Sequence, residues 1–237
     1  MRKIELEWVL YFIKESLPYI RITAQYVFFS FLIGTVIGSF VAKGRMSSNK
    51  IANAISGLYV TIVRCTPSIV LLFLVYFGFP SLVNGTAFGQ WLYTLPVIVF
   101  VIATYSIFMG ASISEIIRSA YGVVNKGQRE AGLSVGMSEL QTFIHVVFPQ
   151  MLKASIPNIG NTLIFLFKEG ALAYTIGLQD ILGRAYFLSG KTMNVHSLSM
   201  YVALTFIYWP ISLILENLFK MLQKKMNYVH LEKSKTA

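Results

Sequence analysis

The chain has 237 residues, of which 55% are hydrophobic and only 13% are charged, against about 25% charged residues in an average soluble domain. This composition excludes an ordinary soluble protein and predicts a single-domain integral membrane protein. The net charge of +10 does not indicate nucleic acid as a partner, because the Lys and Arg residues collect in gaps between apolar runs instead of forming one basic face. Cys65 is the only cysteine, which excludes an internal disulfide and a cysteine-based metal site.

The N-terminal part combines an amphipathic segment with an apolar run. Residues 1–20 mix charged and apolar side chains, a pattern typical of a helix lying in the membrane interface, and Pro18 is expected to end that helix. Residues 22–42 form a run of 21 residues without a charge, which is long enough to cross about 30 Å of hydrocarbon. This run is the first expected span.

Further apolar stretches predict four more spans, and thus an all-α integral membrane protein with five transmembrane helices. The five spans form one transmembrane domain over about residues 21–220, followed by a basic tail at 221–237. Residues 80–90 form a charge-free loop in which Asn84 and Gly85 predict a turn. The later spans are expected at about 57–79, 91–117, 156–177 and 198–219.

The distribution of Lys and Arg predicts which side of the membrane each loop faces. If the tail is cytoplasmic, the cytoplasmic gaps hold twelve of these residues and the outer loops hold two. Cytoplasmic loops carry an excess of Lys and Arg. We therefore expect the N-terminus outside and the C-terminus in the cytoplasm, although four basic residues in the N-terminal segment weakly favour the reverse.

A polar hairpin between the third and fourth spans then faces the cytoplasm. Residues 129–135 predict two helical turns that stop at Gly136. Residues 138–141 fit a capping box that begins a second helix, and Pro149 is expected to end it. Most of the surface of the first helix is small, so another protein can approach its backbone closely. The pattern itself leaves two interpretations open, a connector between spans or a docking surface.

Several charged side chains fall within the apolar spans, where a central charge costs at least about 2.5 kcal/mol. Arg64 and Glu115 are either a structural ion pair between helices or functional groups. A functional role is favoured for a polar cluster in the fourth span, because helical spacing brings an ammonium, a carboxylate, an amide and a hydroxyl to one face. These groups suit a zwitterionic ligand. The cluster consists of Asn161, Thr162, Phe165, Lys168 and Glu169.

One segment, at residues 185–192, has the spacing of a loosened phosphate loop. Such a loop needs glycine amides between a strand and a helix, whereas its first position here is Ala185 and the segment is expected on the outer side. No group of His, Cys and carboxylates has the spacing of a metal site. We therefore expect no ATP hydrolysis, no catalytic residue and no bound metal in this chain.

The hairpin resembles the EAA loop of importer permeases of the ATP-binding-cassette (ABC) class, with the pattern E-A-A, three residues, G, nine residues and I-x-L-P. The matching positions are Glu130, Ala131, Gly136 and Pro149, and the positions that differ are Gly132, Val146 and Phe148. Other motifs look like those of polar amino acid permeases of the histidine and glutamine type. They extend the resemblance over about residues 23–219 and lie at 64–67, 115–118, 126–128, 160–161 and 168–172.

This resemblance implies the type I ABC importer permease fold, in a bacterial cell membrane. It also implies that the first helix of the hairpin is a coupling helix that docks on a separate ATPase. Two ATPase subunits, a second permease chain (identical or paralogous) and an external binding protein would complete the importer. ATP and Mg²⁺ would belong to the ATPase, with no cofactor in this chain. The implied coupling residues are Arg129, Glu130, Ala131, Gly132 and Gly136.

The same resemblance implies a substrate path near the midplane of the membrane, with Thr66 opposite the polar cluster of the fourth span. Residues 174–185 look most like permeases for cystine and related sulfur amino acids. The chain is therefore expected to be a transport subunit and not an enzyme, working by alternating access for polar amino acids such as cystine. A secondary transporter or a channel is the alternative, although the chain has no evident internal repeat.

Overall fold

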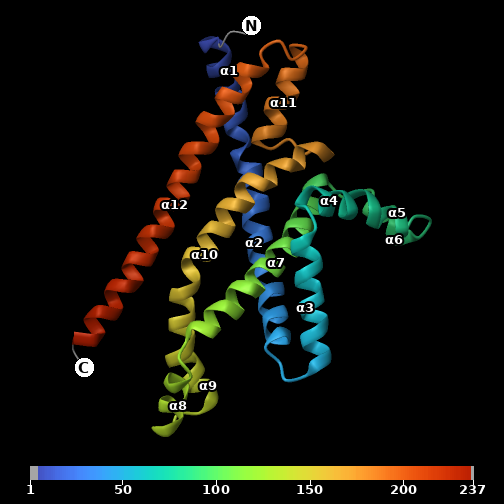
Figure 1. Ribbon diagram of the computed structural model, residues 1–237. Coiled ribbons are helices and arrows are strands. Elements are labelled where there is room, and N and C mark those ends of the chain that lie inside the picture. Colours follow the sequence, from blue (N-terminus) through green and yellow to red (C-terminus); the bar gives the residue numbers. More distant parts are fainter. Residues whose placement is uncertain (1–4, 236–237) are drawn as a thin grey trace.

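A computed structural model describes the chain from residue 5 to residue 235, with side chains described as far as residue 226. Every regular element in this range is helical, as predicted. Figure 1 shows long tilted helices with a hairpin at one end of the bundle and an arm on one side. The α-helices are α1 Leu6–Ser16, α2 Ile20–Arg45, α3 Lys50–Cys65, α4 Ser68–Phe73, α5 Phe79–Leu82, α6 Ala87–Leu92, α7 Val97–Val123, α8 Lys126–Ser134, α9 Glu139–Thr142, α10 Phe148–Glu169, α11 Ile181–Lys191 and α12 Ser197–Lys235.

The N-terminal helix ends at Ser16, near Pro18 as predicted, but the helical path continues beyond it. A 3₁₀ turn, Leu17–Tyr19, joins α1 to α2, so that residues 6–45 form one helical stretch of 40 residues. Proline is tolerated there because the first turn of a helix has no partner for its N–H. α1 packs on α11 and α12 through an apolar core that includes Phe12 and Met200. The amphipathic pattern therefore reflects packing inside the bundle. Residues 1–4 lie outside the described residues.

Helices α2 and α7 form the centre of the bundle, and their contact is the most extensive between any two elements of the described chain. Small residues on the buried side of α2 allow this approach, and a methyl group on Gly34 would lie 2.4 Å from Cβ of Met109. Close packing through small residues is usual between membrane helices. The main apolar core surrounds this contact and reaches Leu72 on α4 and Leu166 on α10.

The second expected span, 57–79, is broken, which corrects the prediction of one continuous helix. α3 ends at Cys65, and α4 leaves it at an angle of 107°. Pro67 causes the break because a proline disfavours helical geometry in the residue before it, and Thr66 is accordingly extended, with φ −91° and ψ 127°. The chain then continues sideways as the arm visible in Figure 1.

Two prolines elsewhere do not end their helices. Pro149 was expected to end the second helix of the hairpin, but it lies in the first turn of α10. A π-helical turn, Phe143–Val147, precedes it and joins α9 to α10, so the expected end is wrong. Pro80 follows a second π-helical turn, Leu74–Gly78, in the same way. A widened turn shifts the hydrogen-bond pattern by one residue, and the prolines occupy positions at which a missing N–H is tolerated.

Three helical stretches are long and apolar enough to cross a membrane, at residues 6–45, 97–123 and 197–226, and the bent pair α3–α4 would be a fourth. α10 contains most of the fourth expected span and continues as a 3₁₀ turn, Gly170–Ile176, so the count of five spans stays a prediction. The N and C ends lie at opposite ends of the bundle (Figure 1), as an odd number of spans requires.

Candidate functional site

The first helix of the hairpin ends before Gly136 as expected from the sequence, but it begins at Lys126, three residues earlier than predicted. α8 starts after Asn125, whose side-chain oxygen accepts a hydrogen bond from an amide of the first turn. It stops before Gly136, which has a φ of +86°. The amides of Gly136 and Met137 donate to the carbonyls of Leu133 and Gly132, at 3.0 and 3.1 Å. This is the Schellman motif, whose left-handed residue is usually glycine.

The second helix is fastened to the first. Ser138 and Gln141 form the expected capping box at the start of α9. Arg129 of α8 donates two hydrogen bonds to Glu139, with 2.5 Å between Nη2 and Oε1 and 3.1 Å between Nε and Oε2. The hydrogen bond to Glu139 holds the pKa of Arg129 above its ordinary value. Two parallel bonds fix orientation as well as distance, so Arg129 connects the two helices of the hairpin.

Gly132 also acts inside the hairpin. It is the only fully buried residue of α8 and faces Thr142 at the end of α9. A methyl group at this position would lie 2.7 Å from Cγ2 and 3.0 Å from Oγ1 of Thr142. The close approach that glycine permits here is therefore between the two helices of the hairpin. The side chains of Glu130 and Ala131 are exposed on α8.

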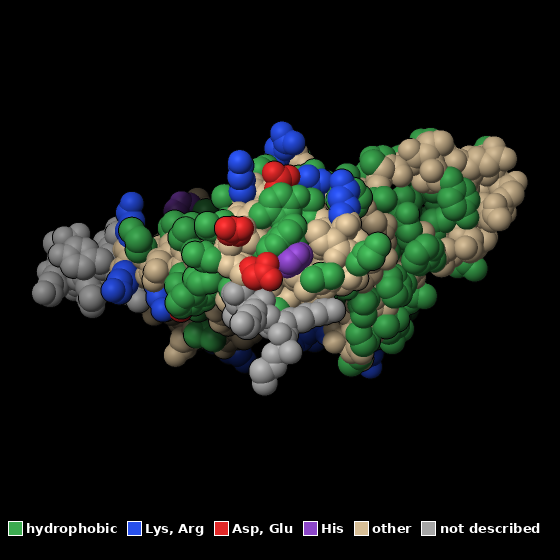
Figure 2. All heavy atoms as spheres, turned by 90° about the horizontal axis from the view of Figure 1, so that it is seen from above, with side chains coloured by type: hydrophobic (Ala, Val, Ile, Leu, Met, Phe, Trp, Pro, Cys, Tyr) green, Lys and Arg blue, Asp and Glu red, His purple; other side chains and the backbone are tan. Residues whose placement is uncertain are grey.

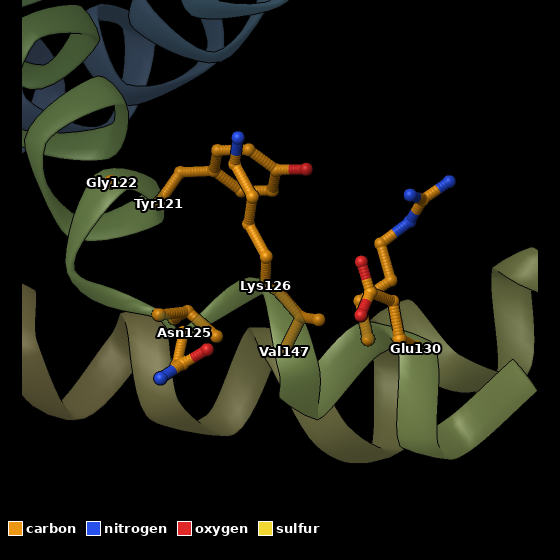
Figure 3. Close-up of a pocket in the computed structure, with 8 residues that line it drawn as sticks. Tyr121, Gly122, Asn125, Lys126, Glu130 and Val147 are labelled. Atoms are coloured by element: carbon orange, nitrogen blue, oxygen red, sulfur yellow. The ribbon is translucent and has the colours of Figure 1, made fainter.

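A cavity of about 360 Å³ lies where α7 meets the hairpin. In Figure 3 the side chains of Tyr121 and Lys126 lie close together above α8, and Glu130 stands one helical turn further along. The cavity thus offers an ammonium, a carboxylate and a phenol at the junction between a span and the hairpin. Its lining residues are Tyr121, Gly122, Val124, Asn125, Lys126, Arg129, Glu130 and Val147.

Within the bundle, the break after α3 meets the end of α10 at Glu169. The hydroxyl of Ser68, the first residue of α4, donates a hydrogen bond to the carboxylate of Glu169. The hydroxyl of Tyr105 on α7 donates to the backbone carbonyl of Glu169 at 2.9 Å. Next along the chain, Gly170 leaves room for the ring of Tyr26, because a methyl group on Gly170 would lie 2.3 Å from that ring. α4 thus contacts the carboxylate of Glu169 and α7 its backbone carbonyl, at the point where α10 gives way to a 3₁₀ turn.

The other residues of the expected substrate site surround this point less directly. Thr66 is half-buried at the break, and its hydroxyl donates to the carbonyl of Ile62 at 2.7 Å. Thr162 is likewise half-buried, with its hydroxyl on the carbonyl of Asn158. Asn161 and Lys168 are exposed on the surface of the single chain.

Two alternatives were predicted for Arg64 and Glu115, and the structure corrects one of them. The ion pair between these two residues is not formed. Glu115 accepts hydrogen bonds from Arg45, at the end of α2, and from Arg118, one turn further along α7. Arg64 is exposed, and it does not belong to any of the ion pairs among the described residues. No group of three or more metal-ligating side chains comes together in the described part of the chain.

The sequence matches the family model described as "Binding-protein-dependent transport system inner membrane component" over residues 34–228. The chain belongs to this family. The permease is 34% identical to the L-cystine transport system permease protein TcyL of Bacillus subtilis, over 91% of this chain and 88% of that protein. It is also 34% identical to the probable amino-acid ABC transporter permease protein YckA of the same organism, over 91% and 92% of the two chains.

A solved structure supports the same fold. The permease matches a chain from "Crystal structure of an amino acid ABC transporter with histidines" with a TM-score of 0.81 and 26% identity, over 94% of this chain and 99% of that one. The expected fold of an ABC importer permease is therefore confirmed, and the chain is a transport subunit of the amino acid ABC permease family.

Two contacts of the permease were missed by reasoning from its sequence. Ser68 follows the Thr66–Pro67 break, and a hydroxyl directly after a proline in an apolar span is a signal that could have been used. Tyr105 lies in the apolar run of α7, between Thr104 and Ser106. Nothing in the sequence indicates that its hydroxyl reaches Glu169, because 64 residues separate the two.

Proposed function

We propose that this permease is the membrane subunit of an ATP-driven importer that takes a polar amino acid such as cystine from an external binding protein. The observation that carries the proposal is that both ends of the hairpin lead to Glu169. α8 follows α7, on which Tyr105 contacts Glu169, and the second helix of the hairpin continues into α10, which ends at Glu169. A movement of the hairpin is therefore transmitted to the same intramembrane residue, Glu169, along two helices.

The coupling surface consists of the exposed part of the hairpin. Glu130 and Ala131 contact the ATPase, while Arg129, Gly132 and Gly136 keep the hairpin rigid through the ion pair, the close packing and the left-handed turn described above. The cavity beside Lys126 and Glu130 presents both charges to side chains of the ATPase. A rigid connector is required because a flexible one would absorb the movement instead of transmitting it.

The transport cycle is alternating access in an assembly of two permease chains and two ATPases. ATP and Mg²⁺ bind to the ATPases, whose closure moves the two hairpins together and opens the bundle outward. Release of the hydrolysis products resets the assembly. In this arrangement the hairpin and the C-terminus are cytoplasmic, and the N-terminus and the α11–α12 turn face the binding protein, in agreement with the positive-inside rule.

The substrate is a zwitterion held between two helices. Lys168 pairs with the carboxylate of the amino acid and Glu169 with its ammonium, and Thr66, Asn161 and Thr162 contribute neutral polar groups. Charged side chains within a membrane protein usually mark a substrate pathway. Cystine carries two zwitterionic ends, and the name of TcyL assigns cystine transport to that relative. The relatedness supports cystine as the first substrate to test.

The proposal is tested by reconstituting the permease with its ATPase and binding protein in liposomes. Uptake of labelled cystine is expected only with all components and with ATP. Gly136→Arg is expected to abolish coupling without preventing membrane insertion, because a bulky residue is strained at a φ of +86°. Gly136→Asn is the matched control, since asparagine tolerates this conformation. Uptake driven by an ion gradient without an ATPase would instead favour the alternative, a secondary transporter or channel.

A further inference from the structure

One buried carboxyl lies near the proposed substrate site without belonging to it. Figure 2 views the bundle from the end that carries α1 and α11, and shows acidic and basic side chains at its surface. Asp180, in the loop between the fourth and fifth expected spans, is instead 0% exposed. A buried carboxylate is costly unless a cation or hydrogen-bond donors compensate its charge. None of the ion pairs among the described residues includes Asp180, so it depends on hydrogen bonds.

The two oxygens of Asp180 bond to different parts of the bundle. Oδ1 accepts from the amide of Gly183 at 2.9 Å and so caps the start of α11. Oδ2 accepts from the hydroxyl of Tyr26, a fully buried residue of α2, at 3.4 Å. The first bond is local, whereas the second joins residues 154 positions apart. A helix cap requires only the first bond, so the second connects α11 to the centre of the bundle.

Tyr26 brings Asp180 into contact with the residue next to Glu169. The hydroxyl end of the Tyr26 ring packs on Gly170, where a methyl group would lie 2.3 Å from Cε2 and 2.7 Å from the hydroxyl oxygen. The same ring stacks on that of Tyr105 at 6.3 Å, and Tyr105 bonds to the carbonyl of Glu169. Tyr26 is thus held between Asp180 and the start of the 3₁₀ turn. A displaced Tyr26 ring would allow this turn to shift, and Glu169 with it.

The segment between Glu169 and Asp180 is itself closely packed. Gly177 ends the 3₁₀ turn with a φ of +89°, and the amide of Leu178 donates to the carbonyl of Ala173 at 3.2 Å. α11 starts against this turn, because a methyl group on Gly183 would lie 2.1 Å from the carbonyl oxygen of Leu178. The position of Asp180 is therefore fixed relative to the turn, as a flexible loop would not allow.

We propose that Asp180 is a positioning residue for the substrate site: by holding the hydroxyl of Tyr26 it fixes the turn after Glu169, and thus the carboxylate that binds the amino acid. The inference rests on the proposed function, because it takes Glu169 as a substrate-binding residue. Asp180 does not contact the substrate, since it is fully buried. Its effect is on how tightly the amino acid binds and not on the ATP-driven step.

The protonation state of Asp180 determines how strongly Tyr26 is held. Burial raises the pKa of the Asp180 carboxyl to about 7, and the hydrogen bonds from Gly183 and Tyr26 oppose this rise. Above pH 7 the carboxyl is ionised, and a hydrogen bond to an ionised acceptor is about twice as strong as one between neutral groups. A fall in pH through 7 is therefore expected to loosen the site. The other titratable or charged groups that face Asp180 or its helix are Tyr105 on α7, Tyr208 on α12, Tyr174 in the 3₁₀ turn, and Arg184 on α11 with its neighbours Glu15 and Tyr19.

Binding of labelled cystine to the purified permease–ATPase complex in detergent, without the binding protein, tests the proposal. Tyr26→Phe keeps the ring and removes the donor, so the dissociation constant above pH 7 is expected to rise about fivefold. The ratio of this constant to that of the wild type should shrink as the pH falls through 7. Titration of cystine itself cancels in the ratio, because both proteins are measured at the same pH.

Two further variants make this comparison specific. Asp180→Asn keeps the cap of α11 but does not titrate, so its dissociation constant relative to that of Tyr26→Phe should not depend on pH. Tyr59→Phe removes a hydroxyl that donates to the carbonyl of Ile107 at 2.7 Å, and this matched control should bind as the wild type does. Equal constants for Tyr26→Phe and the wild type, or a ratio that is the same at every pH, would overturn the proposal.

Amide hydrogen exchange separates this inference from the proposed function, because it needs no substrate. Tyr26→Phe is expected to lower the protection of residues 170–176 about fivefold and to leave that of α3 unchanged. Tyr59→Phe should leave the protection of residues 170–176 unchanged. Unaltered protection of this turn in Tyr26→Phe would refute the role of Asp180. The expected loss of protection, in a complex whose wild type does not bind cystine, would support the hold on the turn and refute the proposed substrate alone.

Discussion

The hydroxyl of Tyr105 donates a hydrogen bond of 2.9 Å to the backbone carbonyl of Glu169. Tyr105 is fully buried in the middle of α7, and Glu169 is the residue at which α10 gives way to a 3₁₀ turn. The last carbonyls of an α-helix need partners from outside the helix, and this tyrosine supplies one. The bond attaches the end of α10 to the helix that leads into the hairpin.

Removing this bond is expected to weaken transport without preventing assembly. Tyr105→Phe keeps the ring and deletes the donor, which costs about 1 kcal/mol for a typical hydrogen bond. We expect kcat/KM for ATP-dependent uptake in liposomes to fall about fivefold. Tyr93→Phe, at a position that is 61% exposed, is the control and should transport normally. Equal rates for the two variants would mean that the bond has no role in transport.

Ser68 is expected to hold Glu169 in place for the substrate. Ser68→Ala removes a hydrogen bond to a carboxylate, and such bonds contribute about 1.5–3 kcal/mol. We expect the KM for uptake to rise about tenfold, while Glu169→Gln should lose more because it also removes the charge. The control is Ser81→Ala on the same arm, whose hydroxyl bonds to the carbonyl of Phe77. A KM for Ser68→Ala equal to that of the control would exclude this role.

Enlarging Gly132 is expected to force the two helices of the hairpin apart. In Gly132→Ala the new methyl group meets Thr142 at 2.7 Å, and overpacking of this kind costs about 1–3 kcal/mol. The expected result is weaker binding of the ATPase, measured by co-purification. Adding Thr142→Ala removes the atoms that clash and should restore binding. Gly57→Ala on α3 has open space around it and should have no effect. If the double variant binds as weakly as the single one, the clash is not the cause.

Glu115 is expected to stabilise the end of the bundle at which α2 ends, and Arg64 is not. Glu115→Gln leaves Arg45 and Arg118 close together without the carboxylate that joins them. At about 1 kcal/mol for a partly exposed network, the midpoint of thermal unfolding in detergent should fall by about 2–4 °C. Arg64→Gln should leave the midpoint unchanged, because Arg64 is exposed and outside these pairs. A larger loss from Arg64→Gln would contradict the geometry described here.

Much of the local structure could be predicted from residues that are neighbours along the chain. The capping box of Ser138 and Gln141 and the stop at Gly136 depend on side chains and torsion angles within a few residues. The all-helical membrane fold follows from long apolar runs, because backbone groups in lipid must be satisfied within their own helix. The spacing from Glu130 to Pro149 was sufficient to indicate the family.

The prolines show that neighbouring residues along the chain do not suffice to predict where a helical path breaks. Pro67 breaks its helix, whereas Pro18 and Pro149 lie in helical turns that continue. The residue type is the same, but its effect depends on whether the surrounding packing favours a continued helix and whether an adjacent 3₁₀ or π turn accommodates the missing donor. That balance is decided by the neighbouring helices and not by the few residues on either side.

The partners of the charged groups were decided only in three dimensions. Glu115 pairs with Arg45 instead of Arg64 because α2 ends beside it, and the carboxylate and the carbonyl of Glu169 meet Ser68 and Tyr105 from two other helices. Each of these contacts joins residues more than sixty positions apart. Helical periodicity predicts which residues share a face, but only the crossing of the helices determines what that face meets.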